Sequence, residues 1–152
     1  MKAALAQAGT DHKEVLIDFG ADWCPDCQVL DKLFQSHSTG SLLQKDYHVV
    51  AVDVGQFNLN LGFTAKYVNL ETSGIPALVV LTPNGKARFA TNDGSFENAR
   101  TMNNDQVNAF LAIGCAGCVT GQPPAGPSGR FSDGGVTVVA VLTAEPDGTG
   151  YV

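Results

Sequence analysis

Basic residues and long apolar runs are both scarce in this sequence. Lysine and arginine together number 9 among 152 residues, against 15 aspartates and glutamates, and the formal net charge at pH 7 is −6. Nucleic-acid-binding domains and surfaces that dock on anionic lipid need clustered positive charge. No stretch reaches the roughly 18 consecutive apolar residues of a membrane-spanning helix. We therefore expect a globular protein that binds neither nucleic acid nor membrane.

Motifs for metals, cofactors and hydrolytic catalysis are missing as well. The three histidines, His12, His37 and His48, are scattered and lack the spacing of metal ligands. The sequence contains no glycine-rich phosphate loop, no flavin or nicotinamide motif and no Ser-His-Asp set. We therefore predict neither a bound metal nor an organic cofactor.

The N-terminal stretch 1–8 is rich in alanine and has no cleavable apolar core. A chain of this kind is expected in the cytoplasm. It is expected in the periplasm or outside the cell if an export signal has been removed from its N-terminus.

Glycine and proline are distributed unevenly. Residues 114–152 hold 9 of the 17 glycines and 4 of the 7 prolines, but only 4 of the 24 charged residues. That composition is typical of linkers and tails. We predict one domain over residues 1–113 and a tail of different character over 114–152.

The four cysteines form two Cys-x-x-Cys pairs, Cys24 with Cys27 and Cys115 with Cys118. A disulfide scaffold would place its cysteines far apart, because closing a very short loop constrains the unfolded chain little. Close pairs indicate redox chemistry or metal binding.

The hydrophobic pattern predicts alternating strands and helices. Apolar runs predict buried strands at 15–19, 48–54 and 77–81, and Pro-Asn-Gly-Lys predicts a hairpin turn at 83–86. Four helices are expected: one over 3–8 that stops at Gly9, one opened by Cys24 that ends within 36–40, one with Leu59, Phe63 and Tyr67 on one face, and one capped by Asn103 or Asn104 that stops at Gly114. A strand is expected over 87–91, followed by an irregular loop over 92–102.

This order predicts an α/β fold. The first two strands should be parallel through a right-handed crossover, and the hairpin makes the last two antiparallel. The result is a mixed four-stranded sheet with helices on both faces. The run 136–142 adds a fifth strand if it pairs with a sheet edge, and otherwise has no partner.

Four features occur in one order along residues 1–113: Asp18, then Trp23-Cys24-Pro25-Asp26-Cys27, then Gly74-Ile75-Pro76, then the Pro-Asn-Gly hairpin. This series resembles the thioredoxin family. The Pro-Asp dipeptide between the cysteines is similar to that of small thioredoxin-related proteins and of bacterial thioredoxin-like proteins, some of them exported. The resemblance implies the thioredoxin fold and thiol–disulfide exchange.

Cys24 falls at the start of its helix, where Pro25 fits because its missing N–H is not needed. Backbone N–H groups and the helix dipole stabilise a thiolate there, which lowers the pKa of Cys24 below the value of about 8.5 for free cysteine. Cys27 lies one turn deeper on the same face. The resemblance implies that Cys24 is the nucleophile that attacks a substrate disulfide, and that Cys27, shielded and protonated, resolves the mixed disulfide.

Asp18 stands in an otherwise apolar strand, where a buried unpaired carboxylate has a raised pKa; the alternative is a carboxylate that reaches solvent at the strand end. The resemblance implies that Asp18 accepts the proton of Cys27. The lysine that commonly accompanies this acid on the neighbouring strand is absent from 50–52. The resemblance also implies that Pro76 is cis, that substrate adds as a strand along Ile75, and that Trp23 flanks the same groove.

Asp26 should act on Cys24 through its charge. A carboxylate beside Cys24 disfavours a second negative charge, so we predict that the Cys24 thiol is less acidic, and the protein more reducing, than in an Asp26→His variant.

Three interpretations of Cys115 and Cys118 are open. The pair forms a second dithiol that exchanges with the first, a tail disulfide without further role, or half of a four-thiolate zinc site completed by Cys24 and Cys27. Cys115 has no tryptophan, proline or helix start beside it that would activate its thiol.

Together these features predict a thiol–disulfide oxidoreductase, an enzyme that reduces protein disulfides through Cys24 and Cys27 with no cofactor beyond that redox-active pair. It should act as a monomer and draw electrons from a separate reductase. The alternatives are an exported disulfide oxidase or isomerase and, from a third class, a zinc-binding or non-enzymatic interaction module.

Overall fold

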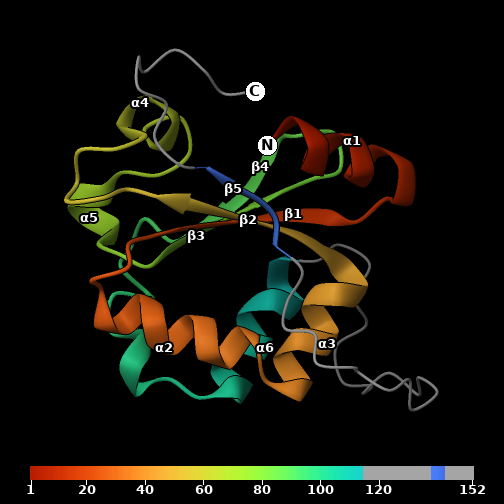
Figure 1. Ribbon diagram of the computed structural model, residues 1–152. Helices are drawn as coiled ribbons and strands as arrows, with labels where there is room; N and C mark the ends of the chain where they lie inside the picture. Colours follow the sequence, from red (N-terminus) through yellow and green to blue (C-terminus); the bar gives the residue numbers. More distant parts are fainter. Residues whose placement is uncertain (115–137, 143–152) are drawn as a thin grey trace.

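The computed structural model describes residues 1–114 and 138–142, which place a five-stranded sheet between two layers of helices (Figure 1). The strand order is β4-β3-β1-β2-β5. The strands are β1 (Glu14–Gly20), β2 (Tyr47–Asp53), β3 (Ala77–Leu81), β4 (Ala87–Ala90) and β5 (Val138–Leu142). β1 is parallel to β2, and β3 is antiparallel to β4, as predicted. β1 also pairs with β3 in the antiparallel direction, which was not predicted. β5 is parallel to β2 at the sheet edge, so the run predicted over 136–142 does add a fifth strand to the sheet.

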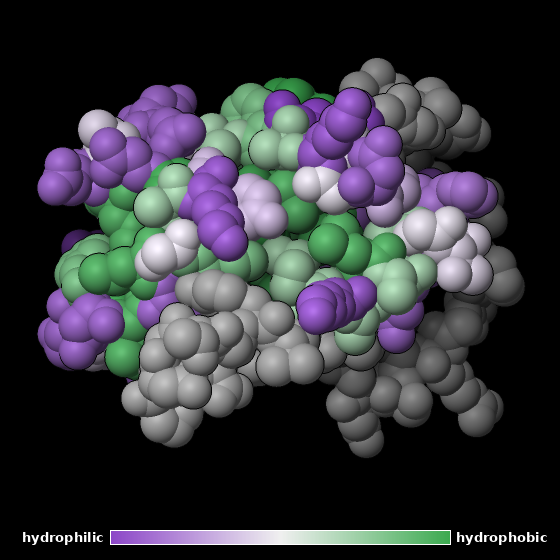
Figure 2. All heavy atoms as spheres, turned by 90° about the horizontal axis from the view of Figure 1, so that it is seen from above, coloured by the Kyte–Doolittle hydropathy of each residue, from purple (hydrophilic) through white to green (hydrophobic). Residues whose placement is uncertain are grey.

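The helices cover both faces of the sheet. They are α1 (Lys2–Asp11), α2 (Pro25–Phe34), α3 (His37–Asp46), α4 (Leu61–Thr64), α5 (Leu70–Ser73), the 3₁₀ helix η1 (Ala99–Thr101) and α6 (Asn104–Gly114). In Figure 1, α2, α3 and α6 lie below the sheet, and α1, α4 and α5 lie above it. Seen from above, hydrophobic residues lie between scattered hydrophilic ones on this face (Figure 2).

The alternation of β1 divides the core between these two layers. Val15, Ile17 and Phe19 point into the cluster on the side of α1 and α4, and Leu16 points into the cluster formed with α2, α3 and α6. Both faces of the strand are buried, which explains its continuous apolar run. Asp18 has the same parity as Leu16, so it lies on the face that α2 covers.

Three predicted helices are wrong in their extent. α1 continues through Gly9 to Asp11, and His12 ends it in the left-handed region with a φ of 62°. The helix expected around Leu59 to Tyr67 is reduced to α4, although Phe63 is buried as predicted. The helix after Cys24 ends at Phe34, before the predicted 36–40.

A helix missing from the sequence prediction, α3, begins directly after α2. Ser36 caps it by accepting a hydrogen bond from the Thr39 N–H. Gly40 lets it pack closely, because a Cβ at that position would lie 3.1 Å from the Phe34 carbonyl oxygen. Polar residues dominate its sequence, so it shows little of the apolar periodicity by which a helix is recognised.

α6 agrees with its prediction. The Asn103 side chain accepts from the Gln106 N–H at 3.1 Å, and the Gln106 side chain accepts from the Asn103 N–H at 3.0 Å. These reciprocal bonds cap the start of the helix. The predicted loop before it contains η1, which is positioned by the burial of Phe96 and Ala99.

The tail predicted over 114–152 is only partly described. Its residues 138–142 form β5, while Cys115 and Cys118 lie outside the described residues. No helix in the described part of the chain is long and apolar enough to cross a membrane.

Candidate redox site

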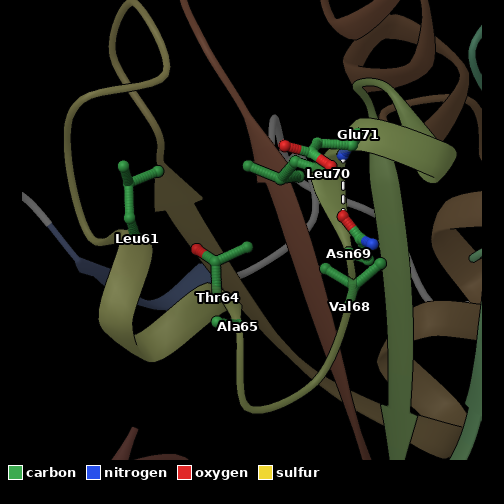
Figure 3. Close-up of a pocket in the computed structure, with 7 residues that line it drawn as sticks. All are labelled: Leu61, Thr64, Ala65, Val68, Asn69, Leu70 and Glu71. Atoms are coloured by element: carbon green, nitrogen blue, oxygen red, sulfur yellow. Dashed lines mark hydrogen bonds between the residues drawn. The ribbon is translucent and has the colours of Figure 1, made fainter.

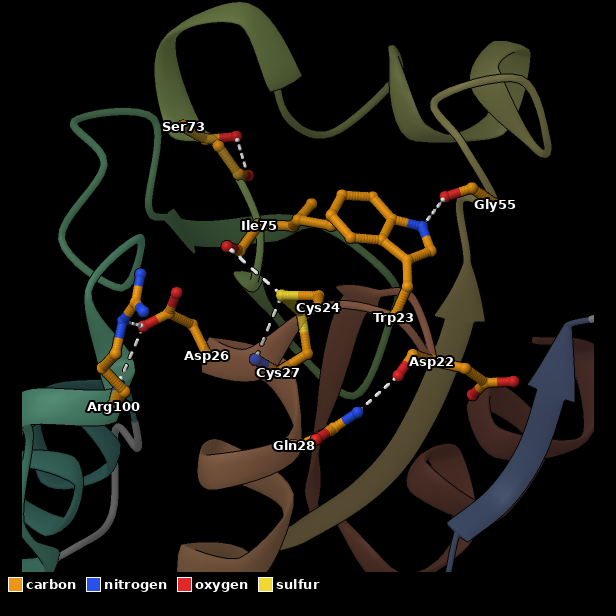
Figure 4. Close-up of a disulfide and its surroundings, with 11 residues drawn as sticks. Asp22, Trp23, Cys24, Asp26, Cys27, Gln28, Gly55, Ser73, Ile75 and Arg100 are labelled. Carbon is orange, nitrogen blue, oxygen red and sulfur yellow. Dashed lines mark hydrogen bonds and ion pairs between the residues drawn. A yellow bond between two sulfur atoms is a disulfide. The ribbon is translucent and has the colours of Figure 1, made fainter.

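A disulfide between Cys24 and Cys27 lies where β1 leads into α2 (Figure 4). The Cα atoms of the two residues are 5.2 Å apart. Cys24 is the N-cap of α2 and Pro25 occupies its first turn. The Cys27 N–H donates to the Cys24 sulfur at 3.1 Å, so the helix start directs a backbone dipole at this atom. The same contact would stabilise a Cys24 thiolate after reduction.

The relative burial of the two cysteines differs from the prediction. Cys24 keeps 3% of its surface exposed, whereas Cys27 is half-buried. The sulfur of Cys24 packs against the Ile75 carbonyl oxygen at 3.8 Å, which explains the low exposure. The prediction considered depth along the helix alone and left out the loop that covers its first turn.

That loop carries the expected proline. The peptide bond between Ile75 and Pro76 is cis, and Ile75 faces the Cys24 sulfur (Figure 4). Gly74 precedes them with a φ of 60°. Glu97 lies against Gly74, since a Cβ there would be 3.2 Å from the Glu97 Cβ. The Ile75 backbone therefore lies beside the disulfide, where an added strand would pass.

Trp23 covers the other side of the disulfide and remains 46% exposed. Its indole N–H donates to the Gly55 carbonyl at 2.8 Å. The ring of Phe57 packs edge-on against it with a centroid separation of 6.0 Å. Phe57 is 45% exposed and has a φ of 59°, so the loop after β2 presents a second aromatic side chain, which was not predicted at this site.

Asp18 lies on the face of β1 that α2 covers. Its neighbours across β2 and β3 are Ala51 and Leu78, neither of which carries a polar side chain. Although the residue as a whole is half-buried, its Oδ1 atom is buried and has no hydrogen-bond partner among the described residues. Burial, with a smaller contribution from the charge of Asp31, raises the pKa of Asp18 to about 7. A carboxyl group of this pKa exchanges protons near neutral pH.

Gly20 connects Asp18 to the disulfide. A Cβ at Gly20 would lie 3.3 Å from the Cys27 sulfur, so Cys27 rests directly on this position. Asp18 is two residues earlier in β1 and therefore on the same face, about 7 Å along the strand. The arrangement places the Asp18 carboxyl on the same face of β1 as the position against which Cys27 rests.

Asp26 is also buried but has partners. Its Oδ1 accepts from the Arg100 backbone N–H at 2.9 Å and from the Arg100 Nε–H at 3.2 Å. Its side chain is 8% exposed, and that of Arg100 is 62% exposed. In Figure 4, the carboxylate lies between the guanidinium and the disulfide. The prediction for Asp26 treated its charge as uncompensated, and Arg100 makes that premise incomplete.

The structure thus brings Trp23, Cys24, Cys27, Ile75 and Pro76 together, with Asp18 and Asp26 on two sides. The sequence analysis missed Arg100 and Phe57. Arg100 is 74 residues from Asp26, in the 3₁₀ helix η1, and no local pattern links them. Phe57 follows Gly55 by two residues, and a glycine after a strand indicates a turn but not which side chain the turn presents.

A separate pocket of about 410 Å³ opens between α4 and α5 (Figure 3). Its apolar lining includes Leu61, Val68 and Leu70. Asn69 caps α5 at its rim by accepting from the Glu71 N–H at 3.0 Å. None of the residues predicted for the redox site lines this pocket.

Known proteins resemble this chain in sequence and in structure. A 39% identical stretch of 57 residues matches thioredoxin of Mycoplasmoides gallisepticum and covers 38% of this chain and 54% of that protein. A 32% identical stretch of 82 residues matches the thiol:disulfide interchange protein DsbD of Campylobacter jejuni and covers 53% of this chain. The chain spans about 14% of the length of that DsbD protein.

The crystal structure of a disulphide isomerase from Xylella fastidiosa Temecula1 superposes with a TM-score of 0.70. It is 40% identical, and the match covers 74% of this chain and 86% of that one. This agreement confirms the predicted thioredoxin fold. Residues 1–83 also match the model of a family described as thioredoxin-like. The chain therefore belongs to the thioredoxin-like family.

Proposed function

We propose that this chain is a thiol–disulfide oxidoreductase that reduces protein disulfides through Cys24 and Cys27. The single observation that carries the proposal is the disulfide at the start of α2, with the Cys27 N–H directed at the Cys24 sulfur at 3.1 Å. Its similarity to proteins named for disulfide interchange and disulfide isomerisation supports the same reaction class.

The reaction starts from the reduced dithiol. The Cys24 thiolate attacks one sulfur of a substrate disulfide, which forms a mixed disulfide and releases the other substrate sulfur as a thiolate. Cys27 then gives its proton to the Asp18 carboxylate and attacks the Cys24 sulfur. The bond between Cys24 and the substrate breaks, a Cys24–Cys27 disulfide forms, and the substrate leaves with both sulfurs reduced. Two electrons have passed from the protein to the substrate.

Substrate binding would use the groove between Trp23 and the cis-proline loop. An extended substrate segment adds along the Ile75 backbone, so recognition depends more on main chain than on sequence. The exposed rings of Trp23 and Phe57 would receive apolar side chains beside the substrate cysteine. All the groups that take part come from one chain, so a monomer suffices.

We propose that no cofactor beyond the Cys24–Cys27 pair takes part and that a separate reductase regenerates the dithiol. The specific observation that favours a second candidate is the 40% identity to a protein named as a disulphide isomerase. An oxidase would use the same residues with the opposite electron flow, whereas an isomerase would use the Cys24 thiolate to rearrange substrate disulfides with no net electron transfer. Reduction potential separates the candidates, since reductants lie near roughly −270 mV and strong oxidants near roughly −120 mV.

The test is reduction of insulin disulfides with dithiothreitol as electron source, together with the reduction potential of the Cys24–Cys27 pair. We expect catalysis by the parent chain, none by Cys24→Ser, and a potential near the reductant value. A matched control carries Cys115→Ser and Cys118→Ser and should remain active. Activity that survives in Cys24→Ser, or that disappears in the control, would assign the reaction to the second pair and refute this proposal.

A further inference from the structure

We propose that Arg100 is a positioning residue that sets the acidity of the Cys24 thiol through its contact with Asp26. The proposal rests on the proposed function in one respect only, that the Cys24 thiolate is the reactive species. Two contacts support it: the backbone N–H and the guanidinium of Arg100, in η1, both donate to one oxygen of Asp26 in the first turn of α2.

The charges around the disulfide are strongly one-sided. The charged side chains at the disulfide end of the elements around it are Asp18, Asp22, Asp26 and Glu97, together with the Arg100 guanidinium. Asp31 and Lys32 lie further along α2. The Asp22 side chain points away from the disulfide in Figure 4. Asp22 and Asp26 are each two residues from Cys24, but Asp22 is exposed and Asp26 is buried, so the charge of Asp26 acts through less water. Arg100 is the cation of this set.

Arg100 offsets that charge by two separable contacts. Its backbone N–H holds the carboxylate in place, while its guanidinium supplies the positive charge. Substitution by an uncharged residue other than proline keeps the first contact and removes the second. Arg100→Met therefore leaves Asp26 anchored and makes its charge uncompensated, which disfavours a thiolate at Cys24. The guanidinium is 62% exposed, so solvent screens part of this effect.

The experiment measures the pH dependence of Cys24 alkylation in reduced protein, located by peptide mass spectrometry in a Cys27→Ser background so that one site is followed. We expect Arg100→Met to lower the proton dissociation constant of the Cys24 thiol by about threefold. Arg100→Lys restores the charge without the fork geometry and should recover part of this loss.

The same substitution in an Asp26→Asn background tests the route of the effect. Without the carboxylate, the exposed guanidinium is no longer held beside the disulfide, so Arg100→Met should then change the Cys24 titration little. An undiminished change in that background would show direct action on Cys24 and overturn the proposal, as would no change in the first variant.

Arg88 provides the matched control, because it also pairs with a buried carboxylate, Glu14, at 3.2 Å. Glu14 begins β1 and lies about 20 Å from the end that leads to Cys24. Arg88→Met should leave the Cys24 titration unchanged; an equal shift would mean that loss of stability, not local charge, is responsible. This experiment measures alkylation of Cys24 and not insulin reduction. If the protein failed to reduce insulin, the effect of Arg100 on the Cys24 titration could still be measured, so the two proposals can fail independently.

Discussion

Two carboxylates on either side of one disulfide have opposite surroundings. Asp18 faces Ala51 and Leu78, and its Oδ1 has no partner among the described residues, so burial raises its pKa to about 7. Asp26 is also buried but receives two N–H groups of Arg100. The difference shows that the hydrogen-bond and ionic partners of a buried carboxyl group, more than its burial, determine its chemical role. The unpaired one suits proton transfer, and the paired one suits anchoring and charge balance.

The largest expected effect comes from removing the unpaired carboxylate. Asp18→Asn keeps the shape of the side chain but cannot accept the proton of Cys27. We expect resolution of the mixed disulfide to slow by about 100-fold, in the range of general-base contributions. Stopped-flow measurement of product release with a fluorescent disulfide substrate would check this. Asp26→Asn is the control and should resolve at close to the parent rate; equal slowing of both variants would remove the distinction between the two carboxylates.

The stability of the same two variants should change in opposite directions. The folded-state pKa of Asp18, about 7, lies above the ordinary value of 3.8, so the folded protein binds a proton more tightly and its free energy of unfolding falls as the pH rises between these values. Asp18→Asn removes that penalty and should be more stable by roughly 2 kcal/mol above pH 7 and little changed in acid. Asp26→Asn should lose about 1 kcal/mol with its charge-assisted bonds. Urea unfolding across this pH range measures both, and destabilisation of Asp18→Asn at high pH would contradict the account.

A lysine at position 51 would make the first carboxylate resemble the second. Ala51 lies directly opposite Asp18 in the β1–β2 register and is half-buried, so Ala51→Lys can place an ammonium beside the carboxyl. We expect the pKa of Asp18 to fall by about one unit. Carboxyl-selective NMR titration reads it directly, with Ala51→Met as the uncharged control of similar length. A fall of the same size in the methionine variant would show that packing, not charge, is responsible.

The smallest expected change concerns Asp31. Its charge is the second cause of the raised pKa of Asp18, after burial. Asp31→Asn should therefore lower that pKa by only about a third of a unit, because burial remains and Asp31 is exposed. The same NMR titration measures the shift. A fall of a full unit or more would mean that repulsion between the two carboxylates, not burial, dominates at Asp18.

The strands were predicted well from the sequence because hydrophobic runs and turn residues both marked them. Continuous apolar runs marked three buried strands, and Pro-Asn-Gly marked the turn between the last pair. Cys24, Cys27 and Pro76 could be found because their motifs are local, and Asp18 because a single acid in an apolar strand stands out. The fifth strand depended on pairing with β2, far away in sequence, so the sequence left it as one of two alternatives.

The features that escaped prediction depend on tertiary contacts. α3 has few apolar positions, and its start depends on Ser36 and on the close packing of Gly40 against α2. Arg100 reaches Asp26 only because η1 packs beside the first turn of α2. Phe57 is presented by a loop whose backbone includes left-handed residues, and no pattern of residue types specifies that geometry. The net charge around the disulfide could not be predicted from sequence neighbours alone, because Arg100 is distant from Asp26 in the sequence.

Capture of the mixed disulfide tests the central claim, that Cys24 attacks and Cys27 resolves, most directly. Reduced protein would be mixed with a disulfide-bonded substrate protein and separated without reductant, with the linked cysteine located by mass spectrometry. We predict that Cys27→Ser accumulates a stable complex joined through Cys24 and that Cys24→Ser accumulates none. A complex joined through Cys27 in the Cys24→Ser variant, or no complex in Cys27→Ser, would contradict this assignment of roles.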